Sequence, residues 1–178
     1  EGVYTSIESV ITTNDVTTVA KDLSPDTKDY SLAYLFKFSN GEQFRVRLHH
    51  TDKDGVYRIQ SMDGSTVAPV WKVGYALTEE QAAKVMTGGI EFRVQLSDTS
   101  AYVYLDGQEV CTYDLSKNMA SGQPSGVDKA TAKVGFSLDG NYGRTTELPF
   151  KLADVSKDVK IYVTDVANGI ITPNKESC

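Results

Sequence analysis

The chain has 178 residues and a formal net charge of −6, and this length suits one domain with a substantial core. The acidic balance excludes a general nucleic-acid binder and adhesion to anionic membranes, because both need a basic surface. No apolar run reaches the roughly 18 residues of a membrane span, and no signal-peptide core is present. Since the first residue is Glu1, we expect residues 1–178 to be a single domain excised from a longer secreted protein.

Apolar and polar residues alternate with period two along most of the chain, which predicts about eleven short strands. In residues 31–38 every second side chain is large and apolar, and Asn40-Gly41 then marks a hairpin. Strands at 44–50 and 56–61 follow. Further strands are expected at 70–77, 90–96, 101–105, 109–115, 130–138, 146–152 and 158–166. Such short, regular intervals predict an all-β protein, a two-sheet antiparallel β-sandwich.

Residues 77–89 interrupt this pattern. Thr78 and Gln81 have the spacing of a capping box, and Gly88-Gly89 ends the segment. We therefore expect one short connecting helix near 78–87, with a role in packing. Residues 117–130 are interpreted as a surface loop, and residues 168–178 as a terminal arm or linker.

Four of the five arginines lie within residues 45–93, on predicted strands and out of phase with the apolar residues. They are Arg45, Arg47, Arg58 and Arg93. His49 and Gln60 share this polar phase, whereas His50 falls in the apolar phase and is interpreted as a strand-end residue. If the strands share one sheet, these side chains form one polar face opposite the core. The alternative is a solvated face in which the arginines pair with carboxylates across strands.

Such a face is suited to sugars, because guanidinium and amide groups donate hydrogen bonds to hydroxyls at fixed angles. Trp71 and Tyr75 are candidates for stacking on sugar rings, and Tyr142 in a Gly-flanked loop is another. A core position is the alternative for Trp71. The predicted carbohydrate-binding residues are Arg45, Arg47, His49, Arg58, Gln60, Trp71, Tyr75 and Arg93.

Catalytic signatures are missing from the sequence. Glu91 and Glu109 each stand alone, whereas glycoside hydrolysis uses two carboxylates. The adjacent His49 and His50 point to opposite faces of a strand, and neither GxSxG nor HExxH occurs. We therefore expect a protein that is not an enzyme and requires no cofactor.

The acidic turns raise the question of a calcium site, and the two cysteines raise the question of a disulfide. Asp52, Asp54 and Asp63 are candidate ligands of a structural calcium ion, although Asp and Gly also form turns for backbone reasons. Cys111 and Cys178 have no CxxC spacing, and a disulfide between them stays open.

A strand, a Leu-Asp-Gly turn and a second strand, AYVYLDGQEVCTYDL (residues 101–115), resemble a hairpin of the concanavalin A-like lectin/glucanase superfamily. Residues 133–163 are similar to the C-terminal part of the same jelly rolls, which include laminin G-like modules, galectins and carbohydrate-binding modules. FRVRLHH, YRIQS and the following Trp71 are loosely similar to the galectin sugar groove. Arg47 and His49 come in the reverse of the galectin order, so the resemblance does not imply galactose as ligand. It does imply a jelly roll that binds sugar, often with structural calcium.

Together these observations predict a non-catalytic carbohydrate-binding module. We expect it to be monomeric and extracellular, without nucleic-acid binding or membrane insertion, and to target a bacterial glycoside hydrolase or adhesin to glycans. The arginines extend this expectation to acidic glycans. One alternative is a protein-binding adhesion or assembly module of the laminin G-like type. A second is a glycosidase or lyase with an unrecognised site.

Overall fold

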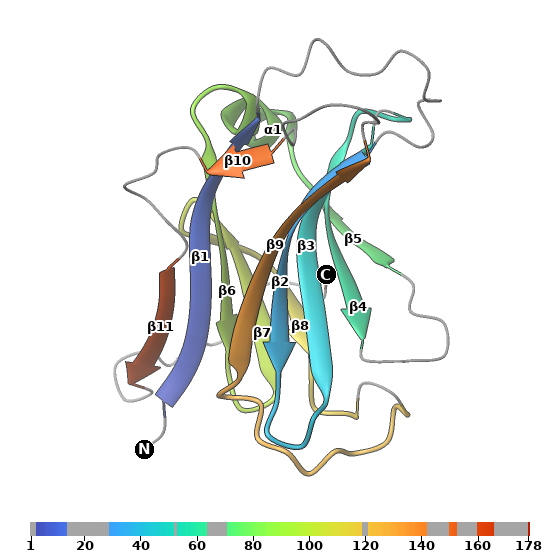
Figure 1. Cartoon of the computed structure of the whole chain (residues 1–178), viewed down its shortest axis with the longest axis vertical. Coiled ribbons are helices and arrows are strands. Elements are labelled where there is room, and N and C mark those ends of the chain that lie inside the picture. Colours follow the sequence, from blue (N-terminus) through green and yellow to red (C-terminus); the bar gives the residue numbers. More distant parts are fainter. Residues whose placement is uncertain are drawn as a thin grey trace.

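The computed structural model describes residues 3–13, 29–51, 53–63, 71–118, 121–141, 150–152, 160–165 and 178. These residues form two antiparallel β-sheets that face each other, with one short helix at one end (Figure 1). The predicted all-β sandwich with a single connecting helix is therefore confirmed.

One sheet has six strands in the order β10-β1-β6-β7-β8, and β11 pairs with β1 beside β10. The strands are β1 (Val3–Thr13), β6 (Ile90–Leu96), β7 (Ser100–Leu105), β8 (Gln108–Asp114), β10 (Phe150–Leu152) and β11 (Lys160–Asp165). The central strand β1 was not predicted from the sequence. Its core-facing positions include the buried polar residues Thr5 and Ser9 beside Ile7 and Ile11, so its apolar alternation is incomplete.

The second sheet has five strands in the order β5-β4-β3-β2-β9. They are β2 (Asp29–Lys37), β3 (Gln43–Thr51), β4 (Tyr57–Asp63), β5 (Lys72–Ala76) and β9 (Lys133–Asn141). The hairpin turn predicted at Asn40-Gly41 connects β2 to β3, and Gly41 has the positive φ of 90° that such a turn requires. We call the side of this sheet that points away from the core the polar face.

The core lies between the two sheets, as the alternation predicts. Phe44, Val46, Leu48, Tyr57 and Ile59 are all buried in it. Across the interface the ring of Tyr34 on β2 stacks on Phe92 of β6, with centroids 4.7 Å apart. The Tyr34 hydroxyl donates to the Phe92 carbonyl oxygen at 2.7 Å and also contacts the Ser9 hydroxyl, so the buried polar atoms of this contact are satisfied.

Helix α1 (Glu79–Met86) has the predicted capping box, since Thr78 accepts from the Gln81 backbone N–H and Gln81 accepts from the Thr78 backbone N–H. Val85 is its buried residue, and the Val85 carbonyl accepts from the Thr12 hydroxyl at 2.8 Å. The helix therefore packs against β1 at one end of the sandwich (Figure 1). No helix in the described part of the chain is long and apolar enough to cross a membrane.

Cys111 on β8 forms a disulfide with Cys178. Cys178 also donates its backbone N–H to the Thr112 carbonyl at 2.8 Å, and its carbonyl oxygen lies close to Gly74 on β5. Residue 178 therefore contacts an edge strand of each sheet. The rest of the predicted terminal arm, residues 168–177, lies outside the described residues.

Candidate functional site

Five predicted residues meet on the polar face of the five-stranded sheet. The register of β3 and β4 places Arg47 opposite Gln60 and His49 opposite Arg58, with Arg45 two residues before Arg47. Their neighbours in sequence, such as Val46, Leu48 and Ile59, are fully buried on the other side. Alternation therefore placed these five residues on the correct face, and their part in binding stays a prediction.

Trp71 lies over Arg47. The Arg47 guanidinium carbon is 4.0 Å from the centre of the Trp71 ring, and the Arg47 Nε–H donates to Gln60 Oε1 at 2.8 Å. This hydrogen bond fixes the plane of the guanidinium group, which then supports the indole as a cation–π pair. The half-buried Trp71 is therefore a surface residue of this face and not part of the core.

A pocket of about 310 Å³ opens beside Trp71. The residues that line it include Arg45, Ser137 and Asp139, which carry polar side chains. Its floor contains Leu35 and Gly135, and a Cβ atom at position 135 would only reach ordinary contact with Leu35, at 3.5 Å. The pocket therefore contains a flat aromatic ring, hydrogen-bonding groups and an apolar floor. Its volume lies within the range of small-ligand sites.

The predicted residues differ in accessibility. Arg45 is exposed, and Arg47 and Arg58 are half-buried. His49 and Gln60 retain only 7% and 8% of their exposed area. His49 Nε2–H donates to Asp29 Oδ2 at 3.2 Å, and Gln60 accepts from Arg47. His49 and Gln60 therefore hold their neighbours in place and offer little accessible surface, whereas Arg45, Arg47 and Trp71 remain accessible to solvent.

Burial determines the charge states of this face. Burial lowers the pKa of Arg47 to about 10, and the nearby carboxylates of Asp29 and Asp139 partly oppose this shift. Because a pKa of about 10 is still well above 7, Arg47 is protonated at neutral pH. Burial and the positive charge of Arg47 also lower the pKa of His49, while the hydrogen bond to Asp29 acts in the opposite direction. His49 is therefore neutral near pH 7.

Among the calcium candidates, only Asp54 has a described side chain. Asp54 forms an ion pair with Arg58, with Oδ2 and Nη1 2.8 Å apart. Asp52 lies outside the described residues, as does Tyr142, and only the backbone of Asp63 is described. No group of three or more His, Cys, Asp or Glu residues that could bind a metal occurs among the described residues. The calcium site stays a prediction.

Arg93 does not belong to this face, which corrects the expectation of one shared surface. It lies on β6 in the six-stranded sheet. Its Nη2 donates to Gln95 Oε1 at 2.8 Å, and its guanidinium carbon is 5.3 Å from the Tyr104 ring. Alternation gives the face of a strand on which a residue lies, but it does not say which sheet the strand joins.

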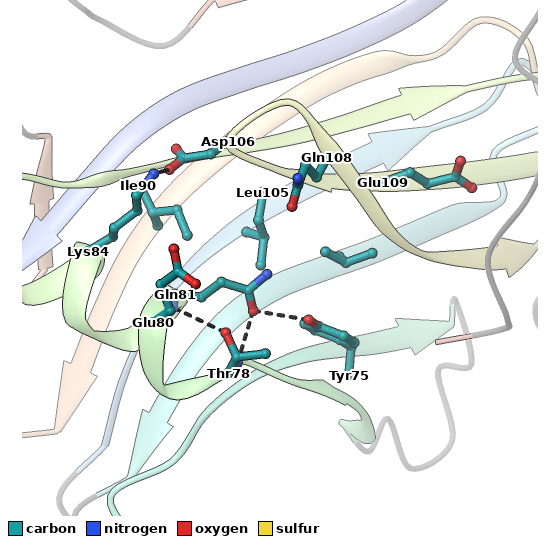
Figure 2. A pocket seen from close by; sticks show the side chains of 11 residues that line it. Tyr75, Thr78, Glu80, Gln81, Lys84, Ile90, Leu105, Asp106, Gln108 and Glu109 are labelled. Atoms are coloured by element: carbon teal, nitrogen blue, oxygen red, sulfur yellow. Dashed lines mark hydrogen bonds and ion pairs between the residues drawn. The ribbon is translucent and has the colours of Figure 1, made fainter.

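Tyr75 is also displaced from the polar face. Between the pairs Arg58–Ala76 and Gln60–Val73 the register of β4 and β5 shifts, so two residues of β5 oppose one of β4. This β-bulge reverses the alternation, and Tyr75 packs against the core instead of joining Trp71. Its hydroxyl donates to Gln81 Oε1 at 3.0 Å, in a second pocket at the sandwich edge (Figure 2).

Sequence reasoning missed the β9 side of the pocket. Gly135, Ser137 and Asp139 face Leu35, Ala33 and Ser31 across the β2–β9 pairing. These strands are almost a hundred residues apart in the sequence, so only the sheet order brings them together. The alternation of 130–138 predicted a strand, and it contained no signal for the neighbouring strand.

No protein-family model and no curated protein matches the sequence. Among solved structures, the chain is similar to sheep galectin-11 in complex with glycerol, with 13% identity and a TM-score of 0.48, over 91% of this chain and 92% of the galectin. Alginate lyase A1-II', a member of polysaccharide lyase family 7, has 14% identity and a TM-score of 0.48, over 93% and 63%. The carbohydrate-binding module CBM66 from Bacillus subtilis has 12% identity and a TM-score of 0.38, over 79% and 69%.

Proposed function

We propose that the polar face of the five-stranded sheet binds carbohydrate without cleaving it. The observation that carries this proposal is the Trp71 ring, supported by Arg47 at 4.0 Å beside a pocket of about 310 Å³. Aromatic faces are negatively polarised, so they attract the C–H groups on the flat side of a sugar ring. Arg45, Ser137 and Asp139 at the pocket supply donors and acceptors for its hydroxyls.

A neutral sugar suits the balance of charge on this face. The three arginines 45, 47 and 58 are matched by Asp29, Asp54 and Asp139. Arg58 is engaged by Asp54, and Arg93 lies on the other sheet. An acidic glycan, expected from four arginines on one surface, therefore has less support than a neutral one.

The carboxylates of this face favour binding over hydrolysis. Asp29 accepts from His49, Asp54 pairs with Arg58, and Asp139 Oδ2 accepts from the Ser137 hydroxyl at 3.0 Å. Hydrolysis of a glycosidic bond typically uses one protonated and one ionised carboxyl group, separated by about 5–10 Å across the bond. Each of these three carboxylates already has a structural partner.

We propose that the protein is a secreted, monomeric module, which targets an enzyme or adhesin to glycans. The disulfide between Cys111 and Cys178 supports an oxidising compartment, because such bonds persist mainly outside the cytosol.

The test is binding of the full chain to a panel of neutral and acidic glycans, followed by calorimetry with any ligand found. Arg47→Ala and Trp71→Ala should each weaken binding about tenfold or more, since a desolvated cation–π pair alone is worth about 2 kcal/mol. Trp71→Phe should retain part of the affinity because it keeps an aromatic face.

Arg93→Ala is the matched control, since it removes an arginine of similar burial from the other sheet. It should bind like the wild type. Absence of binding to every glycan overturns the proposal, and unaltered affinity in both site variants overturns the assignment of the polar face.

A further inference from the structure

A second pocket, which the proposed function does not use, lies at the sandwich edge between α1 and the β7–β8 turn (Figure 2). Its volume is about 410 Å³, larger than the pocket beside Trp71. Ile90, Leu105 and Val110 give it an apolar part, and Tyr75 adds its ring. Most of the remaining lining is polar, so this is a partly apolar pocket with a hydrogen-bonding rim.

One wall of this edge pocket carries an oriented amide. Gln81 Oε1 accepts from the Tyr75 hydroxyl at 3.0 Å and from the Thr78 backbone N–H at 2.9 Å. Both hydrogen bonds are made by the oxygen, which leaves the amide nitrogen without an acceptor among the described residues. The capping box fixes the side chain (Figure 2), so the two N–H donors of Gln81 are held in place before a ligand arrives.

The opposite wall is fixed by Asp106. This residue has a positive φ of 49° in the β7–β8 turn. Its Oδ1 accepts from the Glu91 backbone N–H at 2.9 Å, and its Oδ2 pairs with Lys84 Nζ at 2.5 Å. Lys84 belongs to α1, so this ion pair ties the helix to the turn across the pocket (Figure 2). An exposed ion pair therefore links the two walls of the pocket.

The rim has an excess of negative charge. The lining contains three carboxylates, from Glu80, Asp106 and Glu109, and one ammonium group, from Lys84, so three minus one leaves an excess of two. Within the described part of the chain neither Glu80 nor Glu109 forms an ion pair, and Glu109 Oε1 accepts from the Thr112 hydroxyl at 3.1 Å. Their carboxylates can accept hydrogen bonds from hydroxyl or amine groups, whereas they repel an acidic ligand.

We propose that the edge pocket is a second saccharide-binding site, selective for neutral or amine-bearing sugars over acidic ones. The inference rests on the proposed function for its class of ligand. The Tyr75 ring and the apolar side chains contact the C–H side of the sugar. Gln81 and Gln108 donate to its hydroxyls, and Glu80 and Glu109 accept from its hydroxyls or from an ammonium group.

The test is NMR titration of the isotope-labelled full chain with glucose, glucosamine and glucuronate. The side-chain amide signals of Gln81 and Gln108 should shift saturably with glucosamine and glucose. They should respond to glucuronate about tenfold more weakly than to glucosamine, the effect of one like-charge contact. Failure of both signals to shift with any of the three sugars, or an equal response to glucuronate, overturns the inference.

The same spectra separate this inference from the proposed function. The Trp71 indole and Gln60 amide signals report on the polar face, so the two sites can succeed or fail independently. Replacing both Glu80 and Glu109 by glutamine keeps the shape of the rim and removes two charges. This variant should lose most of the discrimination against glucuronate, and an undiminished discrimination contradicts the role of the two carboxylates.

Discussion

The guanidinium carbon of Arg47 lies 4.0 Å from the centre of the Trp71 ring, and the Arg47 Nε–H simultaneously donates to Gln60. Both contacts need a planar group with several donors at fixed angles. Lysine would preserve the charge and lose both the stacked plane and the Nε donor. The orientation of Trp71 therefore depends on arginine in particular, and not on a positive charge in general.

This dependence predicts that Arg47→Lys weakens glycan binding almost as far as Arg47→Ala, by about 1–2 kcal/mol. Calorimetry measures the affinity, and the emission of Trp71, the single tryptophan, reports its changed surroundings. Arg93→Lys is the control, because Arg93 lies on the other sheet, and it should bind like the wild type. Wild-type affinity in Arg47→Lys contradicts the stacking role.

His49 makes stability depend on pH. Its folded pKa lies below the ordinary value because of burial and Arg47, with Arg58 acting in the same direction and Asp29 against them. The unfolded chain titrates with the ordinary pKa of about 6.5, so below that pH the unfolded state binds more protons. Stability should therefore be full above about pH 6.5 and fall as the pH drops toward the folded pKa.

The measurement is urea unfolding from pH 7.5 to pH 5. His49→Gln retains a donor for Asp29 and removes the titrating group, so its stability should fall less than that of the wild type over this range. Identical pH slopes in the two proteins would show that His49 does not titrate differently in the folded and unfolded states.

Glu42 and Lys129 form a buried ion pair, with 2.7 Å between Oε2 and Nζ and side chains 8% and 0% exposed. Glu42→Gln leaves the Lys129 ammonium buried without its counter-charge and should lower the free energy of unfolding by about 3–5 kcal/mol. The double variant with Lys129→Met should regain part of this loss. Chemical denaturation tests both, and Lys84→Ala, which breaks an exposed pair with Asp106, should have a much smaller effect.

The disulfide should stabilise the domain by constraining the unfolded chain. Cys111 and Cys178 are 67 residues apart, and a loop of that size predicts a loss of about 4 kcal/mol when the bond is removed. Denaturation with and without a thiol reductant measures it. The variant with both cysteines replaced by serine should be insensitive to the reductant, and equal stability of oxidised and reduced wild type would contradict the prediction.

The sequence was informative where one strand's pattern is sufficient. Alternation placed Arg47 and Gln60 on the same side, because β3 and β4 pair in register at these residues. It failed at β1, where Thr5 and Ser9 take core positions that usually carry apolar residues. Ser9 is buried there because it contacts the Tyr34 hydroxyl, and this partner is known only when the sheets face each other.

The other differences have causes that a single strand does not contain. Tyr75 changed sides because of the bulge at β5, which one extra residue produces. Arg93 was assigned to the polar face because its phase is right, although its strand belongs to the other sheet. Asp139 joined the site through the β2–β9 pairing. Local patterning therefore predicted faces, and long-range pairing decided which faces meet.

Gly74 lies in the bulge, and although it has no side chain it affects both pockets. At Gly74 a Cβ atom would lie 2.7 Å from the Ile59 carbonyl oxygen and 2.9 Å from that of Cys178, so β5 would have to move to admit one. Trp71 and Tyr75 stand on either side of this position and serve different surfaces. In a mutational screen, Gly74→Ala should therefore lower the ligand affinity of both binding sites, although residue 74 contacts neither ligand.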